Sequence, residues 1–175
     1  MTTAVLSLGS NQGDRLAYLR GAVAGLGGTV RALSGVYETP AWPPGEQAPP
    51  YLNAAVLVDD PDLDARGWLE QVRDLERAAG RVRDPGWRHA PRTLDVDVIM
   101  VVAGDRPVIS DDPDLTLPHP RAHRRAFVLR PWIDIQPYAR LPGRGPLTDL
   151  LREEAVAAEL AGLRARPDLT LESGV

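Results

Sequence analysis

The sequence predicts an α+β fold in which helices pack on an antiparallel sheet. Apolar runs of strand length, such as residues 3–9 and 51–59, alternate with segments whose apolar residues recur at helical spacing. Their order along the chain is βαββαβ, followed by further short elements. A chain of 175 residues suffices for one core, so we expect a single domain over residues 1–175. The predicted architecture is a ferredoxin-like antiparallel sheet with appended strands and C-terminal helices.

The first elements follow from apolar spacing and glycine positions. Residues 3–9 predict a buried strand, and a helix follows with Ser10 or Asn11 as its expected N-cap. Gly27 and the glycine after it end that helix. The turn-like run "LGSNQGD" resembles a phosphate-binding loop at a helix N-terminus, but capping explains it fully. We therefore read it as structural.

The middle of the chain continues the alternation. Residues 29–39 predict a second strand, which leads into a proline-rich loop. Residues 51–59 predict a third strand, and a helix is expected from about residue 66 to about residue 79. The glycine-, arginine- and proline-rich segment 80–92 is expected to be a mobile loop.

The second half begins with a strand over residues 93–102, in which Leu94 and Met100 are expected on the core face. A turn and a short returning strand at residues 107–110 should follow, then an irregular segment. The apolar run 125–135 is compatible with a strand or a helix. A helical tail is expected over residues 155–175.

Composition excludes several classes of function. There is no cysteine, which removes disulfides, thiolate nucleophiles and cysteine-ligated zinc. All 20 basic residues are arginine, which excludes a lysine-containing phosphate loop and Schiff-base chemistry. A net charge of −4 argues against nucleic-acid binding by bulk electrostatics. No apolar run is long enough to span a membrane, and no signal peptide is visible, so we expect a cytoplasmic protein with no membrane partner.

Two aspartates stand out in the strand at 93–102. Asp95 and Asp97 are two residues apart, so their side chains share one face of the strand. Two neighbouring carboxylates repel each other unless water or a cation neutralises them, and oxygen ligands in a pair suit Mg²⁺. A solvated edge strand is the competing interpretation, and a transition-metal site with nearby histidines is another.

The arginines before these aspartates favour the metal. Arg81, Arg83, Arg88 and Arg92 occur in the glycine- and proline-interrupted segment that leads into the strand. Transfer of a phosphoryl-type group needs a divalent metal, several cations and exclusion of water. The carboxylates can hold the metal, and a loop rich in arginine can supply the cations and close over the site to exclude water. The sequence therefore indicates a polyphosphate site.

Two further groups complete the candidate site. His119 and Arg125 belong to a second basic segment, "HPRAHRRAF", that is suited to phosphate contacts. Tyr51 and Asn53, two residues apart, follow the proline-rich loop that contains Trp42. An amide beside aromatic walls can recognise a flat heterocycle, although an ordinary aromatic cluster gives the same pattern.

Several motifs together resemble one known family. "LSLGSNQGDR", "YETPAW", "YLNAAV", "LERAAGRVR", "RHAPRTLDVDVI" and "LPHPRAHRRAFVLRPW" occur in the order found in 6-hydroxymethyl-7,8-dihydropterin pyrophosphokinase (2-amino-4-hydroxy-6-hydroxymethyldihydropteridine diphosphokinase). The resemblance implies a monomer of ferredoxin-like fold. It also implies transfer of the β,γ-pyrophosphoryl group of ATP to the hydroxymethyl oxygen of the pterin, which gives the pterin diphosphate and AMP in folate biosynthesis.

The resemblance also implies roles for individual residues. Asp95 and Asp97 would bind two Mg²⁺ ions, and Arg81, Arg92 and Asp97 would serve catalysis. The expected ATP-binding residues are Glu76, Arg83, Arg88, Thr116, His119 and Arg125. The expected pterin-binding residues are Thr39, Pro40, Trp42, Tyr51, Asn53 and Phe127. Arg73 stands where the family commonly has glutamine, and His89 where it often has tryptophan.

Two other functions compete with this one. A nucleotidyltransferase or phosphodiesterase can also hold two metals on a D-x-D strand, and it would release pyrophosphate or cleaved ester instead of AMP. An RNA-binding module can share the topology, but it needs paired aromatic residues on its central strands. The candidate strand carries aspartates there, so we expect ATP and the pterin as ligands and no nucleic acid.

Overall fold

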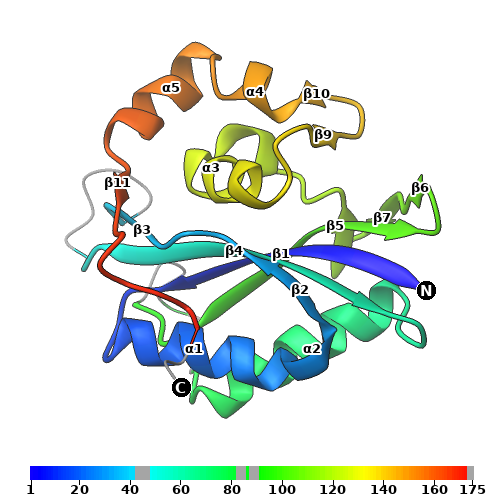
Figure 1. The fold of residues 1–175 in the computed structure, drawn as a ribbon, viewed down its shortest axis with the longest axis horizontal. Coiled ribbons are helices and arrows are strands. Elements are labelled where there is room, and N and C mark those ends of the chain that lie inside the picture. Colours follow the sequence, from blue (N-terminus) through cyan, green and yellow to red (C-terminus); the bar gives the residue numbers. More distant parts are fainter. Residues whose placement is uncertain (42–47, 82–85, 87–90, 173–175) are drawn as a thin grey trace.

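The computed structural model describes residues 1–41, 48–81, 86 and 91–172. The predicted mobile loop and part of the proline-rich loop therefore lie mostly outside the described residues. The centre of the fold is the strand β1 (Thr2–Ser10), which pairs antiparallel with β4 (Tyr51–Asp60) on one side and β5 (Asp95–Ala103) on the other (Figure 1). Ala4 and Leu6 of β1 join the core on one face and Val5 joins it on the other, so every residue of the strand except Thr3 is buried.

The predicted strand 29–39 is present but interrupted. β2 (Val30–Leu33) and β3 (Tyr37–Thr39) both pair with β4, at different places along it. At the break, the Ser34 hydroxyl accepts a hydrogen bond from the Ala55 backbone N–H (2.8 Å) in place of a backbone carbonyl. The βαββαβ core thus gives the ferredoxin-like strand order predicted from the sequence.

Two helices cover one face of this sheet. α1 (Arg15–Leu26) and α2 (Ala65–Ala78) contribute Leu19, Trp68 and Val72 to a continuous apolar core. They lie together below the sheet in Figure 1. The prediction of an N-cap at Ser10 or Asn11 was wrong, because the Asp14 side chain accepts the Ala17 N–H (3.0 Å) and caps α1.

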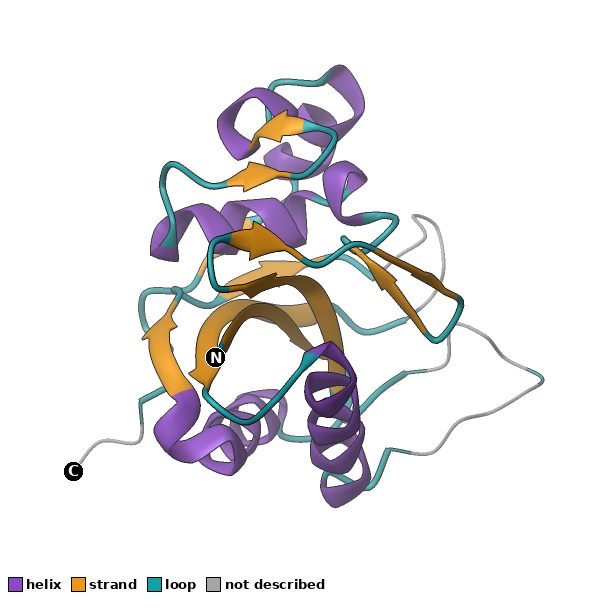
Figure 2. Ribbon diagram, turned by 90° about the vertical axis from the view of Figure 1, so that its right-hand side faces the viewer, coloured by secondary structure: helices purple, strands orange, loops and turns teal. Residues whose placement is uncertain are grey.

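A second layer of helices covers the opposite face. α3 (Ala126–Ile135), α4 (Leu147–Leu150) and α5 (Glu154–Ala161) pack there around the buried Trp132. The ambiguous run 125–135 is thus mostly helical. Figure 2 shows the two layers of helices separated by the sheet. The sheet buries apolar residues on both faces, so its strands carry near-continuous apolar runs.

Short elements connect these layers. They comprise the 3₁₀ turns η1 (Gly27–Thr29) and η2 (Ala122–Arg124) and the strands β6 (Arg106–Pro107), β7 (Ser110–Asp112), β8 (Leu115–Leu117), β9 (Arg140–Leu141) and β10 (Gly145–Pro146). β7 and β8 form a hairpin within the segment predicted to be irregular. The returning strand predicted at residues 107–110 is present only as the two-residue strand β6, and Ser110 belongs to β7 instead.

A β-bulge divides β5 into two halves. Leu6 pairs with Val98 and Val5 with Met100, so Ile99 is an extra residue in the strand. Ile99 and Met100 consequently both join the apolar cluster beneath α3. The prediction that Met100 shares the face of Leu94 was wrong, because strict alternation fails at the bulge.

The C-terminal part is only partly helical. The tail predicted to be helical over residues 155–175 contains α5, but the helix ends at Ala161. The strand β11 (Arg164–Ala165) follows and pairs with β3 at the edge of the sheet. Leu171 is buried against the core beside α1. This segment is therefore part of the fold, and a helical tail is not an accurate description of it.

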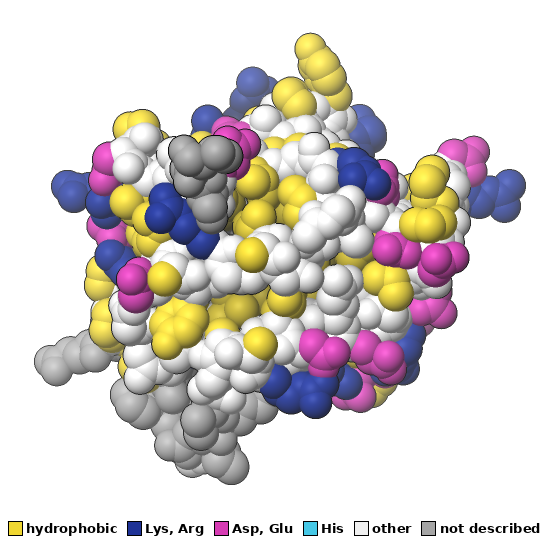
Figure 3. Space-filling view, turned by 60° about the horizontal axis from the view of Figure 1, so that its bottom comes forward, with side chains coloured by type: hydrophobic (Ala, Val, Ile, Leu, Met, Phe, Trp, Pro, Cys, Tyr) yellow, Lys and Arg dark blue, Asp and Glu magenta, His cyan; other side chains and the backbone are white. Residues whose placement is uncertain are grey.

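The surface below the sheet carries charges of both signs. Figure 3 shows described acidic and basic side chains lying side by side on this face. Such mixing gives no extended field of one sign over the face that is visible there. None of the helices among the described residues has the length and apolar character needed to cross a membrane.

Candidate active site

A cavity of about 470 Å³ opens at one end of the sheet, lined by residues of α2 on one side and by Arg125 and Phe127 at the start of α3 on the other. It lies where β1 ends and where β4 and β5 begin. Twelve predicted site residues line it: Thr39, Pro40, Tyr51, Asn53, Glu76, Arg81, Arg92, Asp95, Asp97, His119, Arg125 and Phe127. Trp42, Arg83, Arg88 and His89 lie outside the described residues. One cavity therefore collects segments that are far apart in the sequence.

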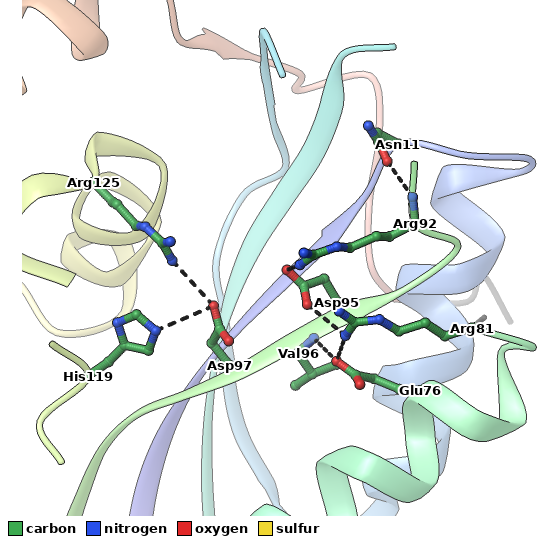
Figure 4. A network of polar contacts seen from close by, with 9 residues as sticks. All are labelled: Asn11, Glu76, Arg81, Arg92, Asp95, Val96, Asp97, His119 and Arg125. Carbon is green, nitrogen blue, oxygen red and sulfur yellow. Dashed lines mark hydrogen bonds and ion pairs between the residues drawn. The ribbon is translucent and has the colours of Figure 1, made fainter. Parts of the chain in front are cut away.

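Asp95 is neutralised by two arginines. Its Oδ1 accepts a hydrogen bond from Arg81 (2.8 Å), and its Oδ2 accepts one from Arg92 (2.7 Å) (Figure 4). Arg81 approaches from the end of α2, and Arg92 from the segment just before β5. The arginines that precede β5 in the sequence thus fold back onto its first carboxylate.

Asp97 has weaker partners. Arg125 Nη1 lies 3.4 Å from its Oδ2, and His119 Nε2 lies 3.8 Å from the same oxygen. Burial, together with repulsion by Asp95, raises the pKa of Asp97 to about 7. A cation bound between the two aspartates would offset the cost of burying the Asp97 charge and reduce the repulsion between the carboxylates. The site therefore favours a positive ligand at this point.

His119 is held as a neutral hydrogen-bond donor. Its backbone N–H donates to the Ile99 carbonyl (2.8 Å), which fixes the residue beside β5. Burial and the nearby charges of Arg125 and Arg121 lower the pKa of His119 to about 4. Its Nδ1 accepts the Arg121 backbone N–H (3.2 Å), so the proton of the neutral ring is on Nε2, which faces Asp97.

Glu76 lies beneath the aspartates on α2 and is 6 % exposed. Its Oε1 accepts hydrogen bonds from the Val96 backbone N–H (3.0 Å) and from the Arg81 guanidinium. Val96 lies between the two aspartates in β5, so Glu76 fixes the backbone that carries them. It also lines the cavity.

A mixed polar and aromatic wall closes the other side. Asn53 is 3 % exposed, and its Nδ2 donates to the Thr39 hydroxyl (2.8 Å). Tyr51 lies beside it, and burial raises the pKa of the Tyr51 hydroxyl. Phe127 completes the wall, with the Arg125 guanidinium 5.4 Å from its ring centre. An oriented amide between aromatic side chains can recognise a flat heterocycle.

Asn11 joins three segments around the cavity, and the sequence reading missed this role. Its Oδ1 accepts the Arg92 N–H (2.7 Å), its N–H donates to the Arg92 carbonyl (3.0 Å), and its Nδ2 donates to the Pro49 carbonyl (3.1 Å). Asn11 is almost fully buried. The sequence signal for this role is a polar residue directly after a buried strand, but helix capping explains the same pattern.

The residues that line the cavity differ from the predicted set at three positions. Thr116 is not among the residues that line the cavity, and its hydroxyl donates to the Asp112 carbonyl (3.1 Å). Arg73 does line it and lies 3.8 Å from Asp114, across the gap between α2 and the β7–β8 hairpin. Gly9 lines it too, opposite Asn53. The absence of a side chain at Gly9 keeps the floor of the cavity open.

The carboxylates fit one type of metal better than another. Among the described residues, no cluster of three or more histidine, cysteine, aspartate or glutamate side chains could enclose a metal ion. Two carboxylates without further protein ligands suit Mg²⁺, which retains waters and takes substrate phosphates as ligands. The described residues therefore offer no closed transition-metal site and fit Mg²⁺.

Comparisons with known proteins agree on one family. The family model described as 7,8-dihydro-6-hydroxymethylpterin-pyrophosphokinase matches residues 5–137. A 2-amino-4-hydroxy-6-hydroxymethyldihydropteridine pyrophosphokinase of Mycobacterium tuberculosis is 45% identical over 181 residues, which cover 99% of this chain and 95% of that protein. The enzyme of the same name from Mycobacterium leprae is 47% identical over 180 residues, covering 98% and 92%.

A solved structure shares the fold at low identity. A chain of an HPPK-DHPS, crystallised in complex with substrates, superposes with a TM-score of 0.65 at 12% identity. The match covers 94% of this chain and 46% of that longer chain, so this chain spans about half of it. That likeness supports the fold alone.

On the family model and the mycobacterial relatives, the chain belongs to the 7,8-dihydro-6-hydroxymethylpterin-pyrophosphokinase family. It transfers the pyrophosphoryl group of ATP to 6-hydroxymethyl-7,8-dihydropterin in folate biosynthesis.

Proposed function

We propose that the cavity above β5 binds ATP and the pterin side by side, with two Mg²⁺ ions held by Asp95 and Asp97. The observation that carries this proposal is the pair of carboxylates on one face of β5, of which Asp97 has a pKa raised to about 7 by burial and by its neighbour. Bound Mg²⁺ supplies charge neutralisation of the phosphate oxygens and orientation of the reacting groups.

Arg81 and Arg92 stabilise the negative charge of the transferring group. Both pair with Asp95 and line the cavity, so their charges are directed into it. Arginine presents a planar set of donors that matches phosphate oxygens, and preorganised donors lower the barrier of the transfer. Arg83 and Arg88 remain predicted ATP-binding residues from the sequence.

The ATP phosphates are contacted by His119 and Arg125. The neutral His119 ring presents Nε2–H toward the space beside Asp97, and the Arg125 guanidinium reaches the same point. Glu76 serves the nucleotide site indirectly, through the Val96 backbone and Arg81. Thr116, just outside the cavity lining, would contribute at most to the wall behind the nucleotide.

The pterin lies against the polar and aromatic wall. Its ring edge carries hydrogen-bond donors and acceptors, which the Asn53 amide reads, and its face stacks on Phe127. Five of the six predicted residues, Thr39, Pro40, Tyr51, Asn53 and Phe127, line this part of the cavity, and Trp42 is the sixth. This arrangement directs the hydroxymethyl group toward Asp97.

The reaction needs positioning more than acid–base chemistry. The hydroxymethyl oxygen forms a bond to the β-phosphorus while the bond from that phosphorus to the α,β-bridging oxygen breaks. The pterin diphosphate and AMP result, and the hydroxyl proton is released. Positioning and charge stabilisation can supply most of the rate enhancement of such transfers.

The test is product identification with ATP, Mg²⁺ and reduced hydroxymethylpterin. We expect AMP to form only when the pterin is present, and Asp97→Ala to abolish turnover while the protein stays folded. Asp105→Ala, in the exposed turn after β5, is the control that should remain active. Pyrophosphate as the nucleotide-derived product, or an active Asp97→Ala variant, would contradict the assignment.

We also propose that the protein acts as a monomer. One copy of the chain brings twelve of the predicted site residues into a single cavity, which supports a site formed within one chain. Light scattering coupled to size-exclusion chromatography should give the mass of one chain, 19.0 kDa. A stable dimer would contradict this.

A further inference from the structure

The C-terminal segment reaches the wall proposed to bind the pterin. This segment lies beyond residue 137, where the match to the family model ends. β11 pairs with β3, with Arg164 opposite Glu38 and Ala165 opposite Tyr37. The Arg166 N–H then donates to the Val36 carbonyl (2.8 Å). The three residues of β3 are thus held between β4 on one side and the C-terminal segment on the other.

Glu38 is the centre of a cluster of ion pairs behind that wall. Its Oε2 lies 2.8 Å from Arg15 Nη1 and 3.4 Å from Arg166 Nη1. Arg166 is in turn paired with Asp168 (2.7 Å). Arg15 Nη1 also donates to the Pro50 carbonyl (3.0 Å). The cluster thereby links the residue before Thr39 to the residue before Tyr51, and none of its side chains lines the cavity.

The C-terminal segment is anchored independently of this cluster. The Thr170 carbonyl accepts a hydrogen bond from Arg20 Nε on α1 (2.9 Å), and Leu171 is 4% exposed. At the other end, Gly162 lies against the pocket, because a Cβ built on it would be 4.0 Å from Pro40 Cδ. A segment fixed at both ends can hold Glu38 in place, which a frayed tail cannot.

We propose that Arg15, Glu38 and Arg166 are positioning residues for the pterin pocket. The ion pairs fix the backbone on either side of Thr39 and Tyr51, so that the Thr39 hydroxyl stays in place to hold the buried Asn53 amide. The inference rests on the assignment of that wall to the pterin under the proposed function. It predicts an effect on one substrate only, since the described residues assigned to ATP and the metal lie on α2, β5, β8 and the segment 119–125, and none lies on β3.

The test measures affinity for the hydroxymethylpterin, in the presence of a non-hydrolysable ATP analogue, together with KM for ATP and Tm. Glu38→Gln and Arg166→Ala should weaken pterin binding roughly 5-fold, as expected for the loss of a charge-assisted contact. Arg166→Lys, which keeps the charge, should restore most of the affinity. KM for ATP should stay unchanged. Arg31→Ala, which breaks a pair with Asp59 at the far end of β4, is the matched control.

A purely structural role of the cluster would give a different result. Unchanged pterin affinity in Glu38→Gln and Arg166→Ala, or equal losses for both substrates, would overturn the inference. The variant Asn53→Ala distinguishes a failure of the positioning role from a failure of the assignment of this pocket to the pterin. Impaired pterin binding in Asn53→Ala beside unaffected cluster variants refutes only the positioning role. Unaffected binding in Asn53→Ala refutes the pocket assignment, and the positioning role with it.

Discussion

Asp95 and Asp97 share one face of β5, but they differ in electrostatic environment. Two arginines lie within hydrogen-bonding distance of Asp95, at 2.8 Å and 2.7 Å. The nearest cationic nitrogen of Asp97 among the described residues is that of Arg125, at 3.4 Å. The second carboxylate thus carries most of the unfavourable charge of the site, which a bound cation would remove.

This difference predicts a pH-dependent stability. A carboxyl whose pKa is raised on folding stabilises the protein fully below its ordinary pKa, and this contribution is lost as pH rises through the folded value. For Asp97 that window runs from about pH 4 to about pH 7. We expect Asp97→Asn to stabilise the metal-free protein at about pH 8 by about 1 kcal/mol, since the partly exposed side chain is screened by solvent.

The measurement is denaturant unfolding in the presence of a chelator, at a pH below the window and at a pH above it. The gain from Asp97→Asn should vanish at the lower pH, where the native side chain is protonated in both states. Asp105→Asn serves as the exposed control. A gain of the same size at both pH values would contradict the charge argument.

Glu76 is expected to be essential for folding stability. Glu76→Ala leaves the Val96 N–H without its acceptor and removes a carboxylate partner from the Arg81 guanidinium, which is 9% exposed. Breaking such a buried pair should lower the free energy of unfolding by about 3 kcal/mol. Glu76→Gln keeps an acceptor for Val96 and should lose clearly less. Thermal unfolding of both variants checks this, and equal stabilities would contradict it.

Asn11 is expected to couple the two walls of the cavity. Asn11→Ala removes the side-chain bonds to the Arg92 N–H and the Pro49 carbonyl inside the protein. We expect a stability loss of about 2 kcal/mol. Affinity should fall for both substrates, because Arg92 faces the phosphates and Pro49 precedes Tyr51. Calorimetric titration with each ligand tests this, and a loss confined to one ligand would argue against coupling.

The hydroxyl of Thr39 is expected to matter for the pterin alone. Thr39→Val keeps the shape of the side chain but removes the acceptor of the Asn53 Nδ2–H. Pterin affinity should fall roughly 5-fold, with KM for ATP unchanged. Thr39→Ser, which keeps the hydroxyl, is the control. Wild-type pterin affinity in Thr39→Val would show that the hydroxyl does not orient the amide.

The local parts of the site could be predicted from the sequence. The shared face of Asp95 and Asp97 follows from the alternation of a strand, and it holds because the bulge at Ile99 comes after them. Arg81 and Arg92 could be predicted to approach Asp95 because the segment that contains them leads directly into the strand. Short-range geometry and charge type were sufficient for these residues.

Other parts depend on contacts between distant segments. The sequence places Glu38 on a strand, but its partners Arg15 and Arg166 come from the two ends of the chain. The role of Asn11 likewise needs the positions of two distant segments. Short apolar runs add a second difficulty, because residues 125–135 have no pattern that separates a strand from a helix. Tertiary packing against the sheet decides that case.

The bulge in β5 also constrains how this strand can change its length. Because Ile99 is the extra residue, removing it would leave every other residue of β5 on its present face of the sheet. The cost would be the unfilled volume of a fully buried side chain, and both carboxylates would still point into the cavity. A deletion of Val96, or an insertion between Asp95 and Asp97, would instead turn one of the two aspartates to the opposite face of the strand. The bulge is therefore the position in β5 at which evolution can add or remove a residue without turning the carboxylates away from the substrates.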